Sequence, residues 1–179
     1  MKNTLAFWAG FLAASIISVS ILSNRPKIST VIRGVTPVIE KWSTSYIPIL
    51  QSKIRFPEVV MSQFILETGY GASEVFKTNG NGFGMRHNKR GFSLGSKLGH
   101  ADYGGDFAKS LADYTAWQNK YLTRYEEKRN IKVKTNEDYI KFLEDYGYAE
   151  DEAYPDKLTN ILKYVQKVRE LKQQDRALI

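Results

Sequence analysis

Residues 57–78 read PEVVMSQFILETGYGASEVFKT, and the fold prediction starts from this stretch. Pro57 and Glu58 favour a helix start, because proline fits the first helical turn and an acidic side chain complements its dipole. Apolar side chains predict that much of this helix is buried: Val59, Val60, Phe64 and Ile65. The glycines that follow predict that the helix ends or breaks between Gly69 and Ser73.

Gln63 and Glu67 are four residues apart, so a helix stacks them on one face. Three apolar residues, Phe64 to Leu66, come directly before Glu67. A carboxyl group that is partly buried among apolar side chains has a raised pKa, stays protonated near neutral pH and can act as a general acid. The spacing alone does not overturn the ordinary interpretation, a solvated or capped glutamate side chain.

A glycine-rich loop follows this helix. Five glycines fall within sixteen residues: Gly69, Gly71, Gly80, Gly82 and Gly84. Glycine at this density lets a backbone approach a ligand closely. The same loop carries amide and apolar side chains, namely Asn79, Asn81, Phe83 and Met85. Amides and an aromatic beside a candidate acid predict a sugar-binding subsite.

Four segments together resemble the bacterial peptidoglycan glucosaminidases, endo-β-N-acetylglucosaminidases with a lysozyme-like fold. SQFILETGYGAS at residues 62–73 is similar to their SQ-x-x-LE-[ST]-G-[WY]-G-x-S signature, and NGFGMR at 81–86 to their N-x-FG-[IM]-[KR] element. SLADYTAWQ at 110–118 resembles an S-[VL]-x-DY-x-x-W helix, and GYAEDEAYPDKL at 147–158 a GYA-x-D-x-x-Y-x-x-KL motif. The segments occur in the family's order, and the resemblance covers about residues 57–165.

The resemblance implies roles for individual residues. Glu67 falls on the family's general acid, and Tyr148 on a tyrosine that lines the catalytic cleft. Asn81 and Phe83 fall in the loop that shapes the sugar groove, and we expect Gln63 to bind substrate beside Glu67. Some aromatic residues also fit a purely structural role: Phe83 and Trp117 as core residues, and Tyr154 as an architectural residue of the late motif.

The second catalytic group is less defined. Many relatives take a second acid from a β-hairpin, which the glycines of residues 85–107 predict here. That segment offers Asp102 and Asp106, and we favour Asp102. If neither serves, water activation or the N-acetyl group of the substrate itself takes over, as in known exceptions to the two-carboxylate scheme.

The composition limits other chemistries. The chain has 179 residues and no cysteine, which excludes disulfides, thiolate metal sites and a thiol nucleophile. Only His87 and His100 offer imidazole. We therefore expect no metal and no organic cofactor. The net charge of +7 favours an anionic partner.

The N-terminal segment is uncharged and apolar. Residues 5–22 read LAFWAGFLAASIISVSIL, long enough as a helix to cross the hydrocarbon core of a bilayer. We predict a membrane anchor over residues 1–24, with a signal peptide or a buried helix as alternatives. Lys2 is the one charged residue there, so the rest keeps 25 of the 26 Lys and Arg against 19 Asp and Glu, or +6.

The predicted organisation is a mainly α, α+β fold: an anchor over 1–24, a connecting arm over 25–56 and a lysozyme-like catalytic domain with a small β-hairpin lobe over 57–179. Apolar residues spaced by three and four predict an amphipathic helix at the C-terminal end, from Leu158 to Leu171. Its basic face is a solvated surface, since no nucleic-acid motif accompanies it, and we expect no nucleic-acid partner.

The predicted function is hydrolysis of the β-1,4 bond after N-acetylglucosamine in peptidoglycan glycan strands, with Glu67 as general acid. A lytic transglycosylase of the same fold is the first alternative, and a non-catalytic wall-binding or virion structural protein is the second. We expect a membrane-anchored or exported protein of the cell envelope or periplasm. A phage origin would allow a virion membrane.

Overall fold

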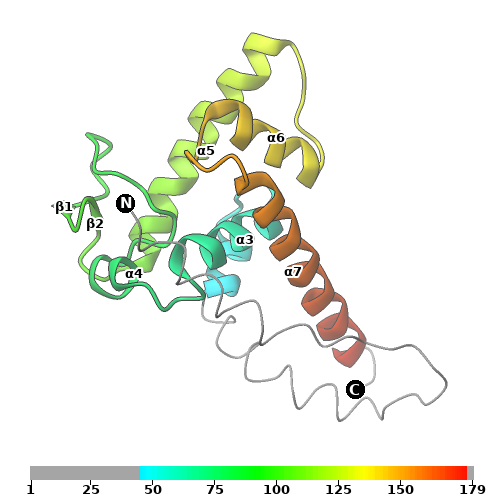
Figure 1. Ribbon diagram of the computed structural model, residues 1–179, viewed down its shortest axis with the longest axis horizontal. Coiled ribbons are helices and arrows are strands. Elements are labelled where there is room, and N and C mark those ends of the chain that lie inside the picture. The colour runs from blue at the N-terminus through cyan, green and yellow to red at the C-terminus, as the bar shows by residue number, and fades with distance from the viewer. Residues whose placement is uncertain (1–44, 177–179) are drawn as a thin grey trace. The chain divides into compact units, whose positions relative to one another are not determined.

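The computed structural model describes residues 45–176, and Figure 1 shows that this part is mainly helical. The named elements are α3 (Pro57–Thr68), α4 (Glu74–Asn79), β1 (Gly95–Lys97), β2 (His100–Asp102), α5 (Phe107–Arg129), α6 (Asn136–Tyr146) and α7 (Tyr154–Arg176). A further helical segment covers residues 45–51. The predicted class, α+β and mainly α with a small β-hairpin, is confirmed. The predicted anchor over residues 1–24 lies outside the described residues.

The helix predicted from residue 57 is α3, and its two ends differ in how they are held. Phe56 precedes it with a left-handed backbone and no side-chain cap, while its ring stacks on Tyr139 with the ring centres 4.9 Å apart. At the other end Gly69, at φ 54°, donates its N–H to the carbonyls of Ile65 and Leu66. Tertiary packing therefore sets the start of α3, and a glycine cap sets its end.

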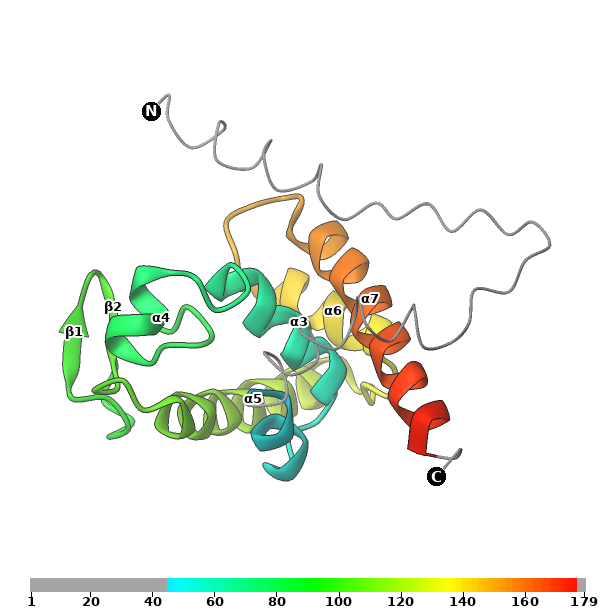
Figure 2. The same ribbon diagram turned by 90° about the horizontal axis from the view of Figure 1, so that it is seen from below.

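Helix α3 forms the centre of the fold. Figures 1 and 2 both place it between α4 with the hairpin on one side and α6 with α7 on the other. Buried side chains occur on every face of it: Val59, Val60, Met61, Ser62, Gln63, Phe64, Ile65 and Thr68. A helix buried all round holds its polar residues in an interior that excludes water, so each of them needs a partner.

Two buried or half-buried carboxylates tie the helices together. Glu58, at the start of α3, accepts hydrogen bonds from Asn136 of α6 and from Gln166 and Arg169 of α7. Glu126 of α5 plays a similar part for the segment before α3. Its Oε1 accepts from Arg55 Nη2 at 2.8 Å and from the Val133 N–H at 2.9 Å.

The hairpin pairs β1 and β2 antiparallel, with Gly95 opposite Asp102 and Lys97 opposite His100. It is attached to α4, because Asn79 Nδ2 donates to the Lys97 carbonyl at 2.7 Å. Asp113 of α5 holds the adjoining loop: its carboxylate accepts from Arg90 Nε, and from the Tyr103 hydroxyl at 2.7 Å. The lobe is thus fixed to the helical core from two sides.

The predicted amphipathic helix at the C-terminal end is α7, which packs on α3 and α6 with Leu158, Leu162 and Val165 buried. Residues 45–56, predicted as part of the connecting arm, contribute Ile49 and Ile54 to the same core. The division of the chain into domains stays a prediction. Within residues 45–176, every helix is too short or too polar to span a bilayer.

Candidate active site

Glu67 lies in the last turn of α3 and faces the glycine-rich loop. A Cβ atom placed on Gly84 would lie 2.8 Å from Glu67 Oε2, and Gly84 has a left-handed backbone at φ 64°. An L side chain there would be strained and would also collide with the carboxyl group. The loop glycine therefore leaves the space that the Glu67 side chain occupies.

Burial decides the acid strength of Glu67. The side chain is only partly exposed, and desolvation raises the pKa of its carboxyl from 4.5 to about 7. A hydrogen bond with the Tyr154 hydroxyl acts in the opposite direction and lowers that pKa. Desolvation disfavours the charged form more than one hydrogen bond supports it, so about half of the carboxyl groups keep their proton at neutral pH.

Asn81 shapes the loop. Its Nδ2 donates to the carbonyls of Met85 at 2.7 Å and Ala101 at 3.1 Å, while its Oδ1 accepts from the N–H groups of Phe83 and Met85. The Asn81 side chain is 2% exposed, and these four hydrogen bonds occupy both its amide protons and its amide oxygen. It positions the backbone around Gly84, and substrate binding by the amide itself stays a prediction.

Phe83 and Tyr148 meet through the backbone. The Tyr148 hydroxyl donates to the Phe83 carbonyl at 2.7 Å. The Phe83 ring lies in the core, 1% exposed, with its centre 4.4 Å from that of Tyr114. Any contribution of Phe83 to a sugar groove therefore comes from its backbone. The Tyr148 side chain is half-buried, and its pKa is raised chiefly by desolvation, and further by Tyr154 and by the Glu67 carboxyl.

Gln63 is completely buried one turn before Glu67. Its Nε2 donates to the Tyr154 hydroxyl at 3.1 Å, and its Oε1 accepts from the Tyr114 hydroxyl. The structure thus brings Gln63 close to the predicted acid, as the helical spacing indicated, but on the interior side of it. Its contact with substrate stays a prediction.

The two candidate second acids both make local hydrogen bonds. Asp102 Oδ1 accepts the Gly104 N–H at 2.9 Å in the turn after β2. Asp106 is the N-cap of α5 and accepts from the N–H groups of Ala108 and Lys109. The preference for Asp102 as second acid stays a prediction.

Comparison with known proteins adds the family. The family model described as Mannosyl-glycoprotein endo-beta-N-acetylglucosaminidase matches residues 45–167. The chain belongs to the glucosaminidase family. It is therefore a glycoside hydrolase of the endo-β-N-acetylglucosaminidase type.

One solved structure similar to this glucosaminidase is the catalytic domain of the autolysin Auto from Listeria monocytogenes. The two are 20% identical with a TM-score of 0.45, and the match covers 94% of this chain and 98% of that one. No curated protein sequence matches the chain significantly.

Three groups around Glu67, the candidate acid of this glucosaminidase, were not predicted as site residues. Tyr154 was expected to be architectural, yet its hydroxyl bonds to Glu67. Tyr114 reaches the same network through Gln63. His100 places Nδ1 3.3 Å from the Gly84 carbonyl. The sequence signal was present for both tyrosines, which lie inside the two later motifs, but only the fold shows where their hydroxyl groups point.

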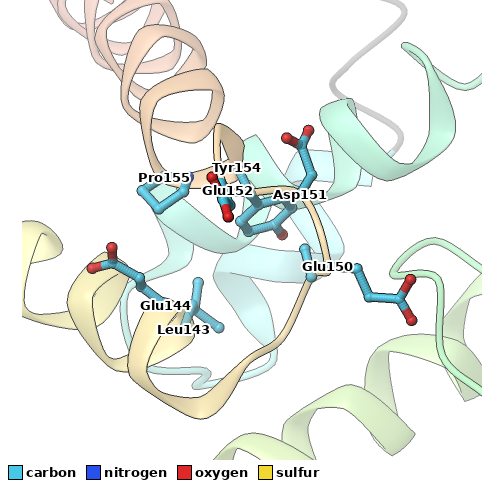
Figure 3. A pocket seen from close by; sticks show the side chains of 8 residues that line it. Leu143, Glu144, Glu150, Asp151, Glu152, Tyr154 and Pro155 are labelled. Atoms are coloured by element: carbon cyan, nitrogen blue, oxygen red, sulfur yellow. The ribbon is translucent and has the colours of Figure 1, made fainter.

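A pocket of about 230 Å³ lies beside this region without including Glu67. Figure 3 shows the Tyr154 ring in the middle of it and the carboxylates of Glu144, Glu150 and Asp151 pointing away from one another at the rim. Among residues 45–176, no group of three or more acidic or histidine side chains is arranged to hold a metal ion.

Proposed function

We propose that this glucosaminidase hydrolyses peptidoglycan glycan strands at the β-1,4 bond after N-acetylglucosamine, with Glu67 as the general acid. The observation that carries the proposal is the environment of Glu67: a carboxyl group with a pKa of about 7, in the last turn of a buried helix, against a glycine of the loop. The lysozyme-like fold is part of the same proposal.

The chemistry follows from that pKa. The protonated carboxyl of Glu67 donates its proton to the glycosidic oxygen as the bond to the anomeric carbon breaks, and the sugar acquires oxocarbenium character. A carboxyl group near pKa 7 is protonated often enough at neutral pH, and acidic enough, to transfer the proton efficiently. Water then completes the hydrolysis.

The group that assists the water is Asp102 or the N-acetyl group of the substrate. The Asp102 carboxylate already accepts the Gly104 N–H, and its second oxygen carries no bond to that turn. Substrate assistance is favoured if Asp102→Asn retains activity. This choice also decides the stereochemical outcome at the anomeric carbon.

The proposed place of action of the protein is the cell envelope. The +6 charge outside residues 1–24 suits a polymer with peptide and wall carboxylates. We propose that the protein is exported and that residues 1–24 anchor it to a membrane, which would be a virion membrane if a phage encodes it. Fractionation of cells expressing the full chain tests the anchor: washing with carbonate leaves an anchored chain in the membrane pellet and releases an unanchored one.

The decisive experiment is Glu67→Gln, assayed on purified cell walls. Glutamine keeps the shape but has no acidic proton, so wall clearing falls at least a hundredfold while the circular dichroism spectrum is unchanged. Glu127→Gln, at an exposed position on α5, is the matched control and keeps full activity. Clearing by Glu67→Gln at the wild-type rate would refute the assignment.

The products separate the alternatives. New reducing ends of N-acetylglucosamine support the proposal, and anhydro-muramic ends identify a lytic transglycosylase. Wall binding without new ends of either kind identifies a non-catalytic wall-binding protein.

A further inference from the structure

The acid proposed above is the last member of a buried chain of hydrogen bonds. Tyr139, Tyr114 and Gln63 are each completely buried, and Tyr154 is 6% exposed. The hydroxyl groups of Tyr139 and Tyr114 are 2.8 Å apart, and Tyr114 bonds to Gln63. In an interior without water each polar group keeps its partner, because an unpaired one is costly.

The direction of this chain follows from the one proton that each hydroxyl group carries. Gln63 Nε2 has only protons to give, so the Tyr154 oxygen accepts there and its own proton is free for Glu67. Gln63 presents Nε2 to Tyr154 because its Oε1 is held at the other end by the Tyr114 proton. Tyr114, having given that proton, accepts from Tyr139.

The far end of the chain is held by the backbone. Gln118 donates from Nε2 to the Arg55 carbonyl at 2.9 Å and accepts the Arg55 N–H at 3.0 Å. These two bonds orient its amide, which hydrogen-bonds to the Tyr139 hydroxyl; burial raises the pKa of Tyr139, and this bond acts against that rise. Every hydroxyl group from Tyr139 to Tyr154 thus donates toward Glu67.

We infer that Tyr139, Tyr114 and Gln63 are positioning residues that compel Tyr154 to donate its hydroxyl proton to Glu67. The inference rests on the proposed role of Glu67 as the acid. The oxygen of Glu67 that accepts from Tyr154 stays an acceptor, so the transferable proton resides on the other oxygen. The network thereby decides which side of the carboxyl group delivers the proton.

Other titratable groups near Glu67 do not duplicate this effect. Tyr148 gives its proton to the Phe83 carbonyl. His100, from β2, lies 3.3 Å from the Gly84 carbonyl, and Arg86 of the loop is exposed. Tyr154 is the hydrogen-bond donor that acts on the Glu67 pKa.

The test is the titration of Glu67 in the full chain, with glutamate carboxyl carbons labelled with ¹³C and the Glu67 signal assigned by its loss in Glu67→Gln. Tyr154→Phe removes the donor, so the Glu67 midpoint rises from about 7 by about one pH unit. Tyr114→Phe leaves Tyr154 in place but frees the Gln63 amide to turn over. Gln63 Oε1 then takes the Tyr154 proton, and the midpoint rises by about half to one unit.

Tyr125→Phe is the matched control, because the Tyr125 hydroxyl bonds to Asp145 and lies outside this network. In that variant the Glu67 midpoint should stay at the wild-type value. If Tyr114→Phe does not fold, Gln63→Met replaces it. That variant keeps the volume but removes the N–H that polarises Tyr154, and the midpoint again rises. A wild-type midpoint in a folded Tyr114→Phe or Gln63→Met variant overturns the inference.

If Glu67 is the acid, the pH at which kcat falls on the alkaline side should rise by the same amount in these variants. Because the titration is read without substrate, it is independent of the wall-clearing assay. If Glu67→Gln clears walls normally while the Glu67 midpoint is shifted in Tyr114→Phe or Gln63→Met, the proposed function is refuted and the role of the hydrogen-bond network stands.

Discussion

At the scale of single residues, the molecule balances two opposed effects on one carboxyl group. Burial raises the pKa of Glu67, and the hydrogen bond from Tyr154 lowers it, with the result near neutrality. Without the hydrogen bond the acid would be too weak to give up its proton readily. Without burial it would be ionised at neutral pH, as an ordinary glutamate is.

This balance reduces stability at high pH. The folded state prefers protonated Glu67 up to about pH 7, whereas the unfolded chain releases that proton near 4.5, so wild-type stability falls as pH rises between these values. Glu67→Gln does not titrate. We expect it to gain up to about 3 kcal/mol over wild type at pH 8, and little at pH 4.5. Urea unfolding at both pH values measures this, and an equal difference at both would contradict it.

Gly84 is the second residue on which the acid depends. In Gly84→Ala the new methyl group meets Glu67 Oε2, and the left-handed backbone adds about 1 kcal/mol of strain. We expect the carboxyl group to be displaced and wall clearing to fall at least tenfold. Gly99→Ala is the matched control: φ is 75°, so the strain is similar, but no atom lies within 4 Å of the new methyl group. An equal loss of wall clearing in the two variants would show that backbone strain alone, and not contact with Glu67, causes the loss.

At the scale of elements, the ends of the helices are where distant segments are joined. α6 begins with a capping box in which Thr135 and Asp138 exchange hydrogen bonds, a purely local device. α3 has no such cap at Phe56, and its first turn is held by Tyr139 and by the Arg55–Glu126 pair. The helix that carries the proposed acid is thus oriented from outside itself.

Glu126 is the test of that orientation. Chiefly through its bond to Arg55, its pKa is lowered from 4.5 to about 2. Glu126→Gln should cost about 2 kcal/mol at pH 7, a value discounted because the Arg55 side chain is 37% exposed and partly screened. The difference in free energy of unfolding between wild type and Glu126→Gln has its full value above pH 4.5 and disappears as pH falls toward 2. Urea unfolding measures it against Glu127→Gln, and a loss that persists at pH 2 would point to packing instead.

At the scale of the whole molecule, the folded unit includes residues that precede α3. Ile49 is fully buried and Ile54 is 6% exposed, and both belong to the same core as α3 and α7. The family match likewise begins at residue 45. The segment before Pro57 therefore contributes to stability as well as connecting the domain.

Two truncated chains test this contribution. Residues 45–179 should unfold cooperatively, whereas residues 57–179 lack both isoleucines and should be less stable by several kcal/mol, because each large apolar side chain removed from a core costs about 2–4 kcal/mol. Thermal melting compares the two, and Ile49→Ala in the longer chain isolates one side chain. Equal melting temperatures would place the boundary of the folded unit at residue 57.

Local patterns determined a large share of this protein. The helix from Pro57, its end between Gly69 and Ser73, a hairpin within residues 85–107 and the amphipathic C-terminal helix were all predictable, because helix starts, glycine signals and apolar periodicity act over a few neighbouring residues. The candidate acid could also be chosen from the sequence, but through the resemblance of residues 62–73 to the glucosaminidase signature, because the apolar residues before Glu67 fit a solvated glutamate as well.

Only the tertiary structure decided what surrounds that acid. Tyr154 and Tyr148 are far from Glu67 in the sequence, and no local rule states that their hydroxyl groups point to Glu67 and to the Phe83 carbonyl. The same holds for Gln63, which the helical spacing placed beside Glu67 but which the fold turns inward to Tyr114 and Tyr154. Burial and hydrogen-bond direction depend on groups brought together by packing, so the sequence could indicate Glu67 as the candidate acid, whereas its pKa depends on the fold.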